Sequence, residues 1–170
     1  MAQGLGTDIR VIGAEVFFLP VQTRVPLKFG PETLTYVTCA RVRLRVRDRA
    51  GREAEGWGET PLSVQWVWPS KLAYEPRHQA LKGFCVRLAQ AWAGFERYGH
   101  PIEVGYDFQQ GVLPGLAREA DGAGKEMPYL AALVCCSPFD LALHDAYGNL
   151  VGRPVYETYN RQYMNRDLAA

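Results

Sequence analysis

Residues 38–47 have the most regular alternation of polarity in the chain. Small or apolar side chains occupy one face and charged ones the other: Thr38, Ala40, Val42, Leu44 and Val46 against Arg41, Arg43, Arg45 and Arg47. A period of two residues is typical of a strand with one face buried and one in water, as in antiparallel sheets. We therefore predict a half-buried antiparallel strand whose arginines point to solvent.

A strand is also predicted before this segment. Ile9–Leu19 is rich in β-branched and aromatic residues, which favour strands. Proline cannot donate a ladder hydrogen bond, so we expect Pro20 and Pro26 to end this strand. Val21–Thr33 is then predicted to be a loop.

The segment after the arginine strand predicts a turn and a third strand. Asp48–Gly51 has turn chemistry, and Gly51 is free to adopt a positive φ. The third strand is expected from about Arg52 to Glu59, followed by a loop at Thr60–Ser70. Three strands joined in this way form an antiparallel meander.

The pattern changes to a helical period after Pro69. Helix formers dominate Lys71–Tyr98, and apolar residues recur there at steps of three and four: Leu81, Phe84, Cys85, Leu88 and Trp92. Gly99–Pro101 is predicted to end this helix. Ile102–Ala120 is expected to be a shorter helical region weakened by Pro114, and Asp121–Gly124 a loop.

The last helical region is predicted in two parts. Pro128–Cys136 is apolar and helical, and Ser137 is expected to cap a new helix, with Pro138 in its first turn and Asp140 three residues on. Two glycines, Gly148 and Gly152, are predicted stop signals, and Pro154 prevents continuation. Strands followed by helices indicate an α+β domain.

Composition places the chain among ordinary globular proteins. It has 170 residues, 48% apolar and 22% charged, with a net charge of +1, so nothing global points to nucleic acid or a membrane. The N-terminus lacks the features of a signal peptide. The four cysteines (39, 85, 135 and 136) have no metal-type spacing, and we expect free thiols in a reducing cytoplasm.

Three short motifs occur in a recognisable order. Gly56-Trp-Gly-Glu59 follows the basic strand, and Ala142-Leu-His-Asp145 and Gly152-Arg-Pro154 come about eighty residues later. This order resembles the N-terminal capping domain of the enolase superfamily, of the mandelate racemase and muconate-lactonizing type. The resemblance runs from Ile9 to Tyr156.

The resemblance implies how the chain is organised. Residues 1–156 are expected to form the capping domain, with an antiparallel meander followed by a helical bundle, and residues 157–170 to begin a linker toward a (β/α) barrel. The sequence ends at Ala170, where the resemblance places the start of that catalytic barrel. The barrel is therefore expected to be absent from this chain.

The resemblance also implies a reaction class. Family members remove a proton α to a carboxylate and stabilise the enediolate on Mg²⁺, with a Lys or His base and acidic metal ligands on the barrel. It implies no catalytic residue and no metal ligand in this chain. The chain would be the specificity lid of an acid-sugar dehydratase, racemase or cycloisomerase, inactive alone. Its partners would be the barrel domain of the same protein, a carboxylate-containing substrate and further copies in a homo-oligomer.

In such a lid, the loops 21–33 and 60–70 would cover the barrel mouth and contact the substrate. Lys28 is a candidate partner for a substrate carboxylate or hydroxyl group. Phe29, Trp66 and Trp68 offer flat apolar walls, whereas Ser63 and Gln65 offer hydrogen bonds. Each has a plainer alternative: a solvated lysine, or tryptophans that only pack the cap onto the barrel.

Other polar groups are weaker candidates for a catalytic or ligand-binding role. Asp140 and His144 lie one helical turn apart and could form half of a metal site, but no third ligand is near in sequence. Glu59 is expected to bind only backbone amides. The arginine face is interpreted as a solvated sheet surface rather than an anion site.

The main alternative is a stand-alone binding module that uses the loops 21–33 and 60–70. The chain would then be a genuine single domain, rather than a fragment or a truncated reading frame. The segment from Val155 to Ala170 has no natural end, which favours the last two. A small hydrolase ranks last, because no nucleophile and base are suggested together.

Overall fold

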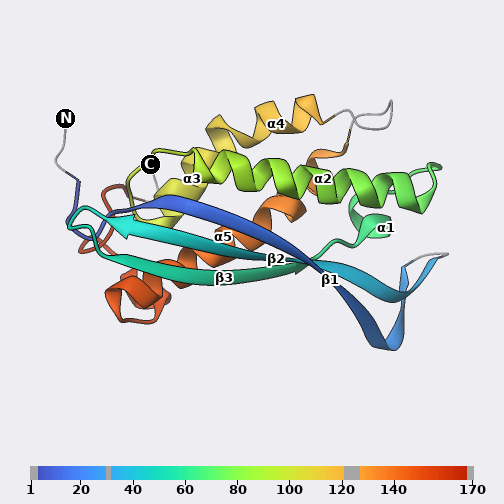
Figure 1. Cartoon of the computed structure of the whole chain (residues 1–170), viewed down its shortest axis with the longest axis horizontal. Coiled ribbons are helices and arrows are strands. Elements are labelled where there is room, and N and C mark those ends of the chain that lie inside the picture. Colours follow the sequence, from blue (N-terminus) through green and yellow to red (C-terminus); the bar gives the residue numbers. More distant parts are fainter. Residues whose placement is uncertain (1–3, 30–31, 121–126, 168–170) are drawn as a thin grey trace.

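Three antiparallel strands form one layer of the protein, and helices form the other (Figure 1). The computed structural model describes residues 4–29, 32–120 and 127–167, so the loop predicted at 121–124 lies outside the described residues. The strands are β1 (Ile9–Phe29), β2 (Glu32–Asp48) and β3 (Glu53–Pro61), paired in chain order. The predicted meander is confirmed, including the turn at Gly51, whose φ is +85°.

The helical layer follows the sheet in sequence and covers one of its faces. It consists of α1 (Val64–Val67), α2 (Tyr74–Ala93), α3 (Pro101–Gly111), α4 (Leu113–Glu119), α5 (Tyr129–Val151) and a 3₁₀ turn, η1 (Val155–Thr158). The α+β class, with strands first and helices after, is confirmed. Among the described residues, no helix combines the length and apolarity needed to cross a bilayer.

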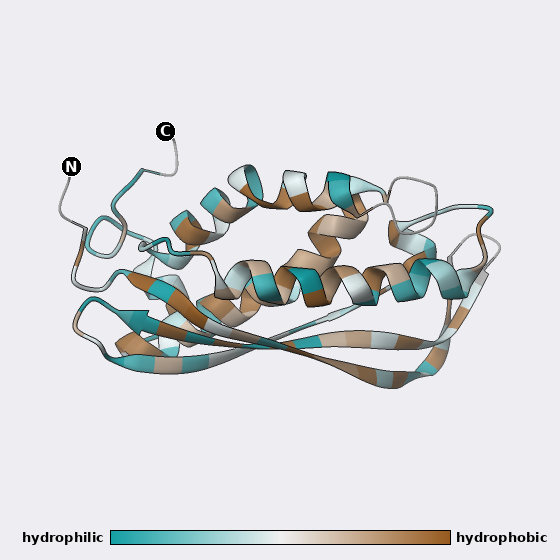
Figure 2. Cartoon of the chain, turned by 45° about the horizontal axis from the view of Figure 1, so that its top comes forward, coloured by the Kyte–Doolittle hydropathy of each residue, from teal (hydrophilic) through white to brown (hydrophobic). Residues whose placement is uncertain are grey.

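The core lies between the sheet and the helices. Ala40, Val42, Leu44 and Val46 of β2 have no exposed surface, so the inner face read from the alternation is confirmed. The predicted stripe on α2 is buried against it, and Trp92 stacks on Phe108 of α3 with ring centroids 3.9 Å apart. The four cysteines are buried. In Figure 2, α5 is mostly hydrophobic in colour, whereas α2 alternates along its length.

Strand β3 and helix α5 approach unusually closely. An ideal Cβ on Gly56 would lie 2.1 Å from Ala146 N, and one on Gly58 would lie 2.1 Å from Pro138 O. Only glycine leaves room for the helix backbone at these positions. The Asp145 carboxylate accepts the Trp57 backbone N–H at 2.8 Å. Two of the recognised motifs thus form a single strand–helix contact.

The first strand is longer than predicted. It continues through Pro20 and Pro26 to Phe29, and the stretch predicted as a loop forms a two-stranded ribbon with the start of β2. A proline is tolerated because β1 is an edge strand, where the N–H is not needed by the sheet. The register shifts between Gln22 and Leu27, and the Thr23 hydroxyl donates to the Thr35 carbonyl there at 3.0 Å.

The predicted helix restart at Ser137 is wrong. Helix α5 runs unbroken from Tyr129 to Val151 with Pro138 inside it. Proline lacks the N–H that would bond to the Val134 carbonyl four residues back. The Ser137 hydroxyl donates to that carbonyl at 2.9 Å and lies 2.6 Å from Thr60 Oγ1. A local side-chain bond therefore replaces the lost backbone bond, so the helix continues.

We expect Ser137→Ala to lower the free energy of unfolding by about 1–2 kcal/mol, because it leaves the Val134 carbonyl without a donor. Urea unfolding measures the change. A second substitution, Pro138→Ala, restores a backbone N–H and should recover most of the loss. Equal stability of Ser137→Ala and the wild type would contradict this account of the helix.

The end of α5 follows the prediction in part. Gly152 takes a left-handed conformation (φ +67°) at the C-cap and stops the helix. Gly148 lies inside α5 instead of stopping it, and an added Cβ would lie 3.1 Å from the Arg153 carbonyl. This glycine allows the chain after the helix to fold back closely.

Residues 157–167 pack against the rest of the chain. Thr158 has no exposed surface, and Met164 is 8% exposed. The His100 ring, at the N-cap of α3, lies 2.9 Å from the Thr158 hydroxyl. The domain boundary proposed at residue 156 stays a prediction, although Thr158 and Met164 beyond it are buried against the rest of the chain.

Candidate functional site

The ribbon formed by the ends of β1 and β2 extends past β3 on the same side of the protein as α1 (Figure 1). Between this ribbon, α1 and the first turn of α2 lies a hollow of about 390 Å³. Its lining is mostly polar or aromatic: Thr33, Leu34, Thr35, Tyr36, Gln65, Tyr74 and Arg77. The hollow is the place where the two segments predicted to contact substrate come together.

Arg77 gives the hollow its positive charge. The residue is 4% exposed, and its guanidinium donates from Nη1 to the Trp68 carbonyl at 2.5 Å and from Nε to the Ala73 carbonyl at 3.3 Å. No carboxylate pairs with it among residues 4–29, 32–120 and 127–167. A buried cation without a counter-ion is costly, so the site is suited to an anion.

Neutral polar groups surround this cation. Burial raises the pKa of Tyr74, and the neighbouring Tyr36 and Glu75 raise it further, so the hydroxyl stays protonated as a donor. The Gln65 Oε1 atom is shielded from solvent and has no hydrogen-bond partner among the described residues. A ligand with both a carboxylate and hydroxyl or amide groups would match this set.

The predicted contact residues are placed in different ways. Gln65 lines the hollow, and Lys28 is exposed on β1 opposite Thr33, which also lines it. Ser63 is the N-cap of α1, without a side-chain cap bond, and Trp66 is 53% exposed. Phe29 ends β1, but its side chain lies outside the described residues.

One predicted wall residue is not exposed. Trp68 is 3% exposed and belongs to the core of this chain, so it packs inside the domain rather than lining a substrate wall or a surface for a barrel. Trp68 is buried and Trp66 is exposed because helix α1 begins at Val64, within the segment predicted as a loop. A helical turn points the two tryptophans in different directions, whereas an extended chain would not.

Five residues of the hollow lie outside the two predicted segments: Leu34, Thr35, Tyr36, Tyr74 and Arg77. Tyr36 lies in the extended part of β2, and Tyr74 and Arg77 lie in the first turn of α2. The sequence around Arg77 resembles that of any surface helix, so no local pattern marks it. Tyr36, close to the predicted loop 21–33, was the one signal in the sequence that pointed to an unpredicted residue of the hollow.

Three of the four arginines on the outer face of β2 are neutralised by glutamates from the neighbouring strands. Arg41 pairs with Glu59 at 2.6 Å, so the prediction that Glu59 binds only backbone amides is wrong. Two more arginines are also paired with acids on β1 and β3: Arg43 with Glu15 and Glu55, and Arg47 with Glu53. This face offers no continuous cationic stripe to a phosphate backbone.

The suggested metal pair on α5 does not converge. His144 Nδ1 lies 2.9 Å from the Asp140 backbone carbonyl and 3.8 Å from its carboxylate. Burial raises the pKa of the Asp140 carboxyl group. Across the part of the chain that the structure describes, no three His, Cys, Asp or Glu side chains are grouped to hold a metal ion.

Comparison with known proteins shows which solved structures are similar to this chain. No family model and no curated protein sequence matches the chain. Among solved structures, it is similar to the dipeptide epimerase from Cytophaga hutchinsonii complexed with Mg and the dipeptide D-Ala-L-Val (TM-score 0.51, 18% identity, covering 87% of this chain and 32% of that chain). It is also similar to the L-talarate/galactarate dehydratase from Salmonella typhimurium LT2 liganded with Mg and L-lyxarohydroxamate (TM-score 0.51, 16% identity, 92% and 35%).

The chain thus spans about a third of the length of the proteins it matches. At these identities the likeness concerns the fold. The similar part is an α+β unit with an antiparallel meander and helices, as the order of motifs predicted. This chain therefore has a fold found in members of the enolase superfamily.

Proposed function

We propose that this chain is the substrate-specificity lid of a Mg²⁺-dependent enzyme of the enolase superfamily. The reaction class is proton abstraction α to a carboxylate, as in acid-sugar dehydratases, racemases and cycloisomerases. The lid has no turnover alone. Its partners are a barrel domain of the same protein, which follows a boundary near residue 156, and further copies of the protein in a homo-oligomer, in the cytoplasm.

The observation that carries the proposal is the uncompensated guanidinium of Arg77 beside the hollow. Its Nη2 group has no hydrogen-bond partner among the described residues, while Nη1 and Nε are fixed by backbone carbonyls. A fixed guanidinium is a strong and directional carboxylate partner. We assign Arg77 to the distal polar end of a carboxylate-containing substrate.

The other side chains of the lid would shape and close the pocket. Gln65, with Tyr36 and Tyr74, would hydrogen-bond the substrate, and Lys28 and Ser63 would add polar contacts from the rim. Phe29 and Trp66 would exclude water. Closing a lid over a site removes water and strengthens the electrostatic interactions inside it.

Mg²⁺ would not be held by this part of the protein. The described residues contain no suitable ligand group, and the proposal places the acidic ligands and the base on the barrel. Magnesium would stabilise the enediolate there. The contribution of this chain is to bind, orient and enclose the substrate.

We expect Arg77→Gln to weaken binding of a dicarboxylate probe, succinate, by about tenfold or more, because a charge-assisted hydrogen bond is lost. NMR chemical-shift titration of the chain follows the signals of Gln65 and Tyr74. Arg87→Gln is the matched control, since Arg87 lies on α2 and pairs with Glu119 instead. Arg77→Lys keeps the charge if the glutamine variant fails to fold. Equal binding by Arg77→Gln and wild type would contradict the role of Arg77.

The wider proposal is tested by reading the gene past codon 170 and comparing it with the intact mass of the native protein. An open frame of roughly 200 residues or more, enough for a barrel, supports the lid. A stop codon with a native mass of 19.0 kDa overturns it. The stand-alone binding module that uses residues 21–33 and 60–70 would then be the function to test.

A further inference from the structure

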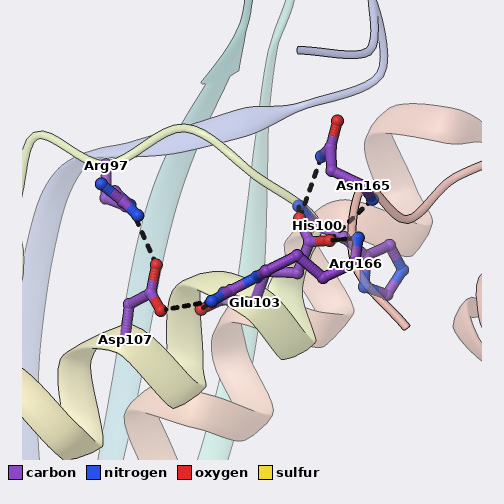
Figure 3. Close-up of polar contacts among 6 residues, drawn as sticks. All are labelled: Arg97, His100, Glu103, Asp107, Asn165 and Arg166. Atoms are coloured by element: carbon purple, nitrogen blue, oxygen red, sulfur yellow. Dashed lines mark hydrogen bonds and ion pairs between the residues drawn. The ribbon is translucent and has the colours of Figure 1, made fainter. Parts of the chain in front are cut away.

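A buried carboxylate anchors the segment 159–167 to the rest of the protein. Glu103, on α3, is 6% exposed. Its Oε1 accepts the backbone N–H groups of Asn165 at 2.6 Å and Arg166 at 2.7 Å. Its Oε2 accepts the His100 N–H at 3.1 Å and the Asn165 side-chain amide at 3.0 Å (Figure 3). Four donors on one carboxylate make a strong anchor.

The side chain of Asn165 joins this anchor to the beginning of the described chain. Its Nδ2 also donates to the Asp8 carboxylate at 2.8 Å, and its Oδ1 accepts the Leu5 backbone N–H at 3.3 Å. Asp8 is 1% exposed and immediately precedes β1. One amide therefore bridges a helix, the start of the chain and the segment 159–167.

Arg166 reinforces the same contact from the other side. Its Nη2 donates to the Glu103 backbone carbonyl at 3.0 Å, and its Nη1 lies 2.9 Å from the Asp107 carboxylate. Asp107 also pairs with Arg97, from the loop before α3, at 2.9 Å (Figure 3). The anchor is thus part of a network along one side of α3.

We propose that residues 4–8 and 159–167 form one cooperative latch, in which the Asn165 side chain joins the two segments, the Glu103 carboxylate anchors them, and they dock and release together. Any event that lifts residues 159–167 would then also free the residues that lead into β1. The proposal does not depend on the function proposed above.

The physical reason for cooperativity is the placement of two buried carboxylates. Release of residues 159–167 would leave Glu103 with the His100 N–H and Asp8 with the longer contact from Arg49 at 3.5 Å. A buried charge that loses a hydrogen bond is strongly disfavoured. Burial by itself would raise the pKa of Glu103, but the bonds from Asn165, His100 and Arg166 hold it below its ordinary value. The ionised carboxylate therefore favours the docked latch.

Asn165→Asp tests the latch with almost no change in shape. The new carboxylate keeps the acceptor for Leu5 but turns a donor into a negative charge facing Asp8 and Glu103. Hydrogen exchange read by mass spectrometry on the full chain should show amides in both 4–8 and 159–167 exchanging about tenfold to a hundredfold faster. Amides of α5 should be unchanged. Gln162→Glu makes the same charge change in the same segment, at an exposed side chain that makes no hydrogen bond to the residues the structure describes, and should have no effect.

Three results would overturn the proposal. One is faster exchange in 159–167 with residues 4–8 unchanged, which would mean that the segments move independently. The second is no change in either segment. The third is the same change in Gln162→Glu, which would assign the effect to net charge. If Asn165→Asp does not fold, Asn165→Ala removes the bridging amide without adding charge and is judged by the same criteria.

Discussion

Gly56→Ala and Gly58→Ala are each expected to lower the free energy of unfolding by at least about 3 kcal/mol, the upper part of the range for overpacking. The methyl group of Gly56→Ala would meet Ala146 N at 2.1 Å and Ala142 O at 2.3 Å. These are backbone atoms of a fully formed helix, so they cannot rotate away. Relief requires α5 to move off β3, which would also break the 2.8 Å bond between Trp57 N–H and Asp145.

The matched control is Gly83→Ala on α2. An added Cβ there meets nothing within 4 Å, and alanine has the higher helix propensity. This variant should therefore gain about 0.5–1 kcal/mol. Urea unfolding of the three variants and wild type measures all changes. A loss below about 1 kcal/mol in Gly56→Ala, well under the expected overpacking cost, would mean that strand and helix are not in this close contact.

Lowering the pH from 6.5 to 4 should reduce the free energy of unfolding by about 3 kcal/mol through the protonation of His100 alone. Its ring is fully buried at the N-cap of α3, where Nδ1 accepts the Ile102 N–H at 3.3 Å. Nε2 then carries the proton and donates to the Thr158 hydroxyl at 2.9 Å. Burial, and next the neighbouring His144, lower the pKa of His100 from 6.5 to about 4, although Glu103 opposes this.

The direction of this pH dependence follows from the difference in proton binding between the folded and the unfolded chain. Between pH 6.5 and 4 the unfolded chain takes up a proton at residue 100 and the folded chain does not, so stability falls as the pH falls through this window. Tyr147 and Tyr159 face the ring at centroid distances of 4.9 and 5.7 Å and stay neutral there. Glu103 and Asp48, whose pKa values are lowered in the folded state, lose their contributions at still lower pH.

The variant His100→Asn distinguishes the contribution of His100 to the pH dependence from those of Glu103 and Asp48. Asparagine is also a good N-cap but does not titrate. The variant should lose less stability than wild type between pH 6.5 and 4, measured as urea midpoints at several pH values. Parallel pH profiles for the two proteins would show that His100 is not held neutral in the fold.

The sequence predicted most of the sheet and the main helical stripe because both depend on local periodicity. The alternation in β2 fixed which face is buried, and the spacing of Leu81 to Trp92 fixed the buried side of α2. The motif Gly56-Trp-Gly-Glu59 was identified from its order in the chain. Its physical role, close contact with α5, became clear only when the two segments were seen together.

The failures of prediction share a cause, which is that a residue's local rule was overruled by a partner distant in sequence or by its place in the fold. Pro20 and Pro26 do not end β1 because that strand lies at the edge of the sheet. Pro138 does not begin a helix because the Ser137 hydroxyl, which also contacts Thr60 Oγ1, replaces its missing donor. A one-dimensional pattern contains neither fact.

The candidate site was likewise predicted only in part from the sequence. The sequence by itself pointed to residues 21–33 and 60–70, and Gln65 among them lines the hollow. Only the tertiary structure brought in Tyr36, Tyr74 and Arg77, because the first turn of α2 and the ribbon line the same hollow. Charge compensation could not be predicted from the sequence either. Arg41, Arg43 and Arg47 of β2 pair with glutamates on the neighbouring strands, whereas Arg77 donates to backbone carbonyls. Local periodicity determined the elements and their buried faces, and packing between distant segments decided which charges remain available to a ligand.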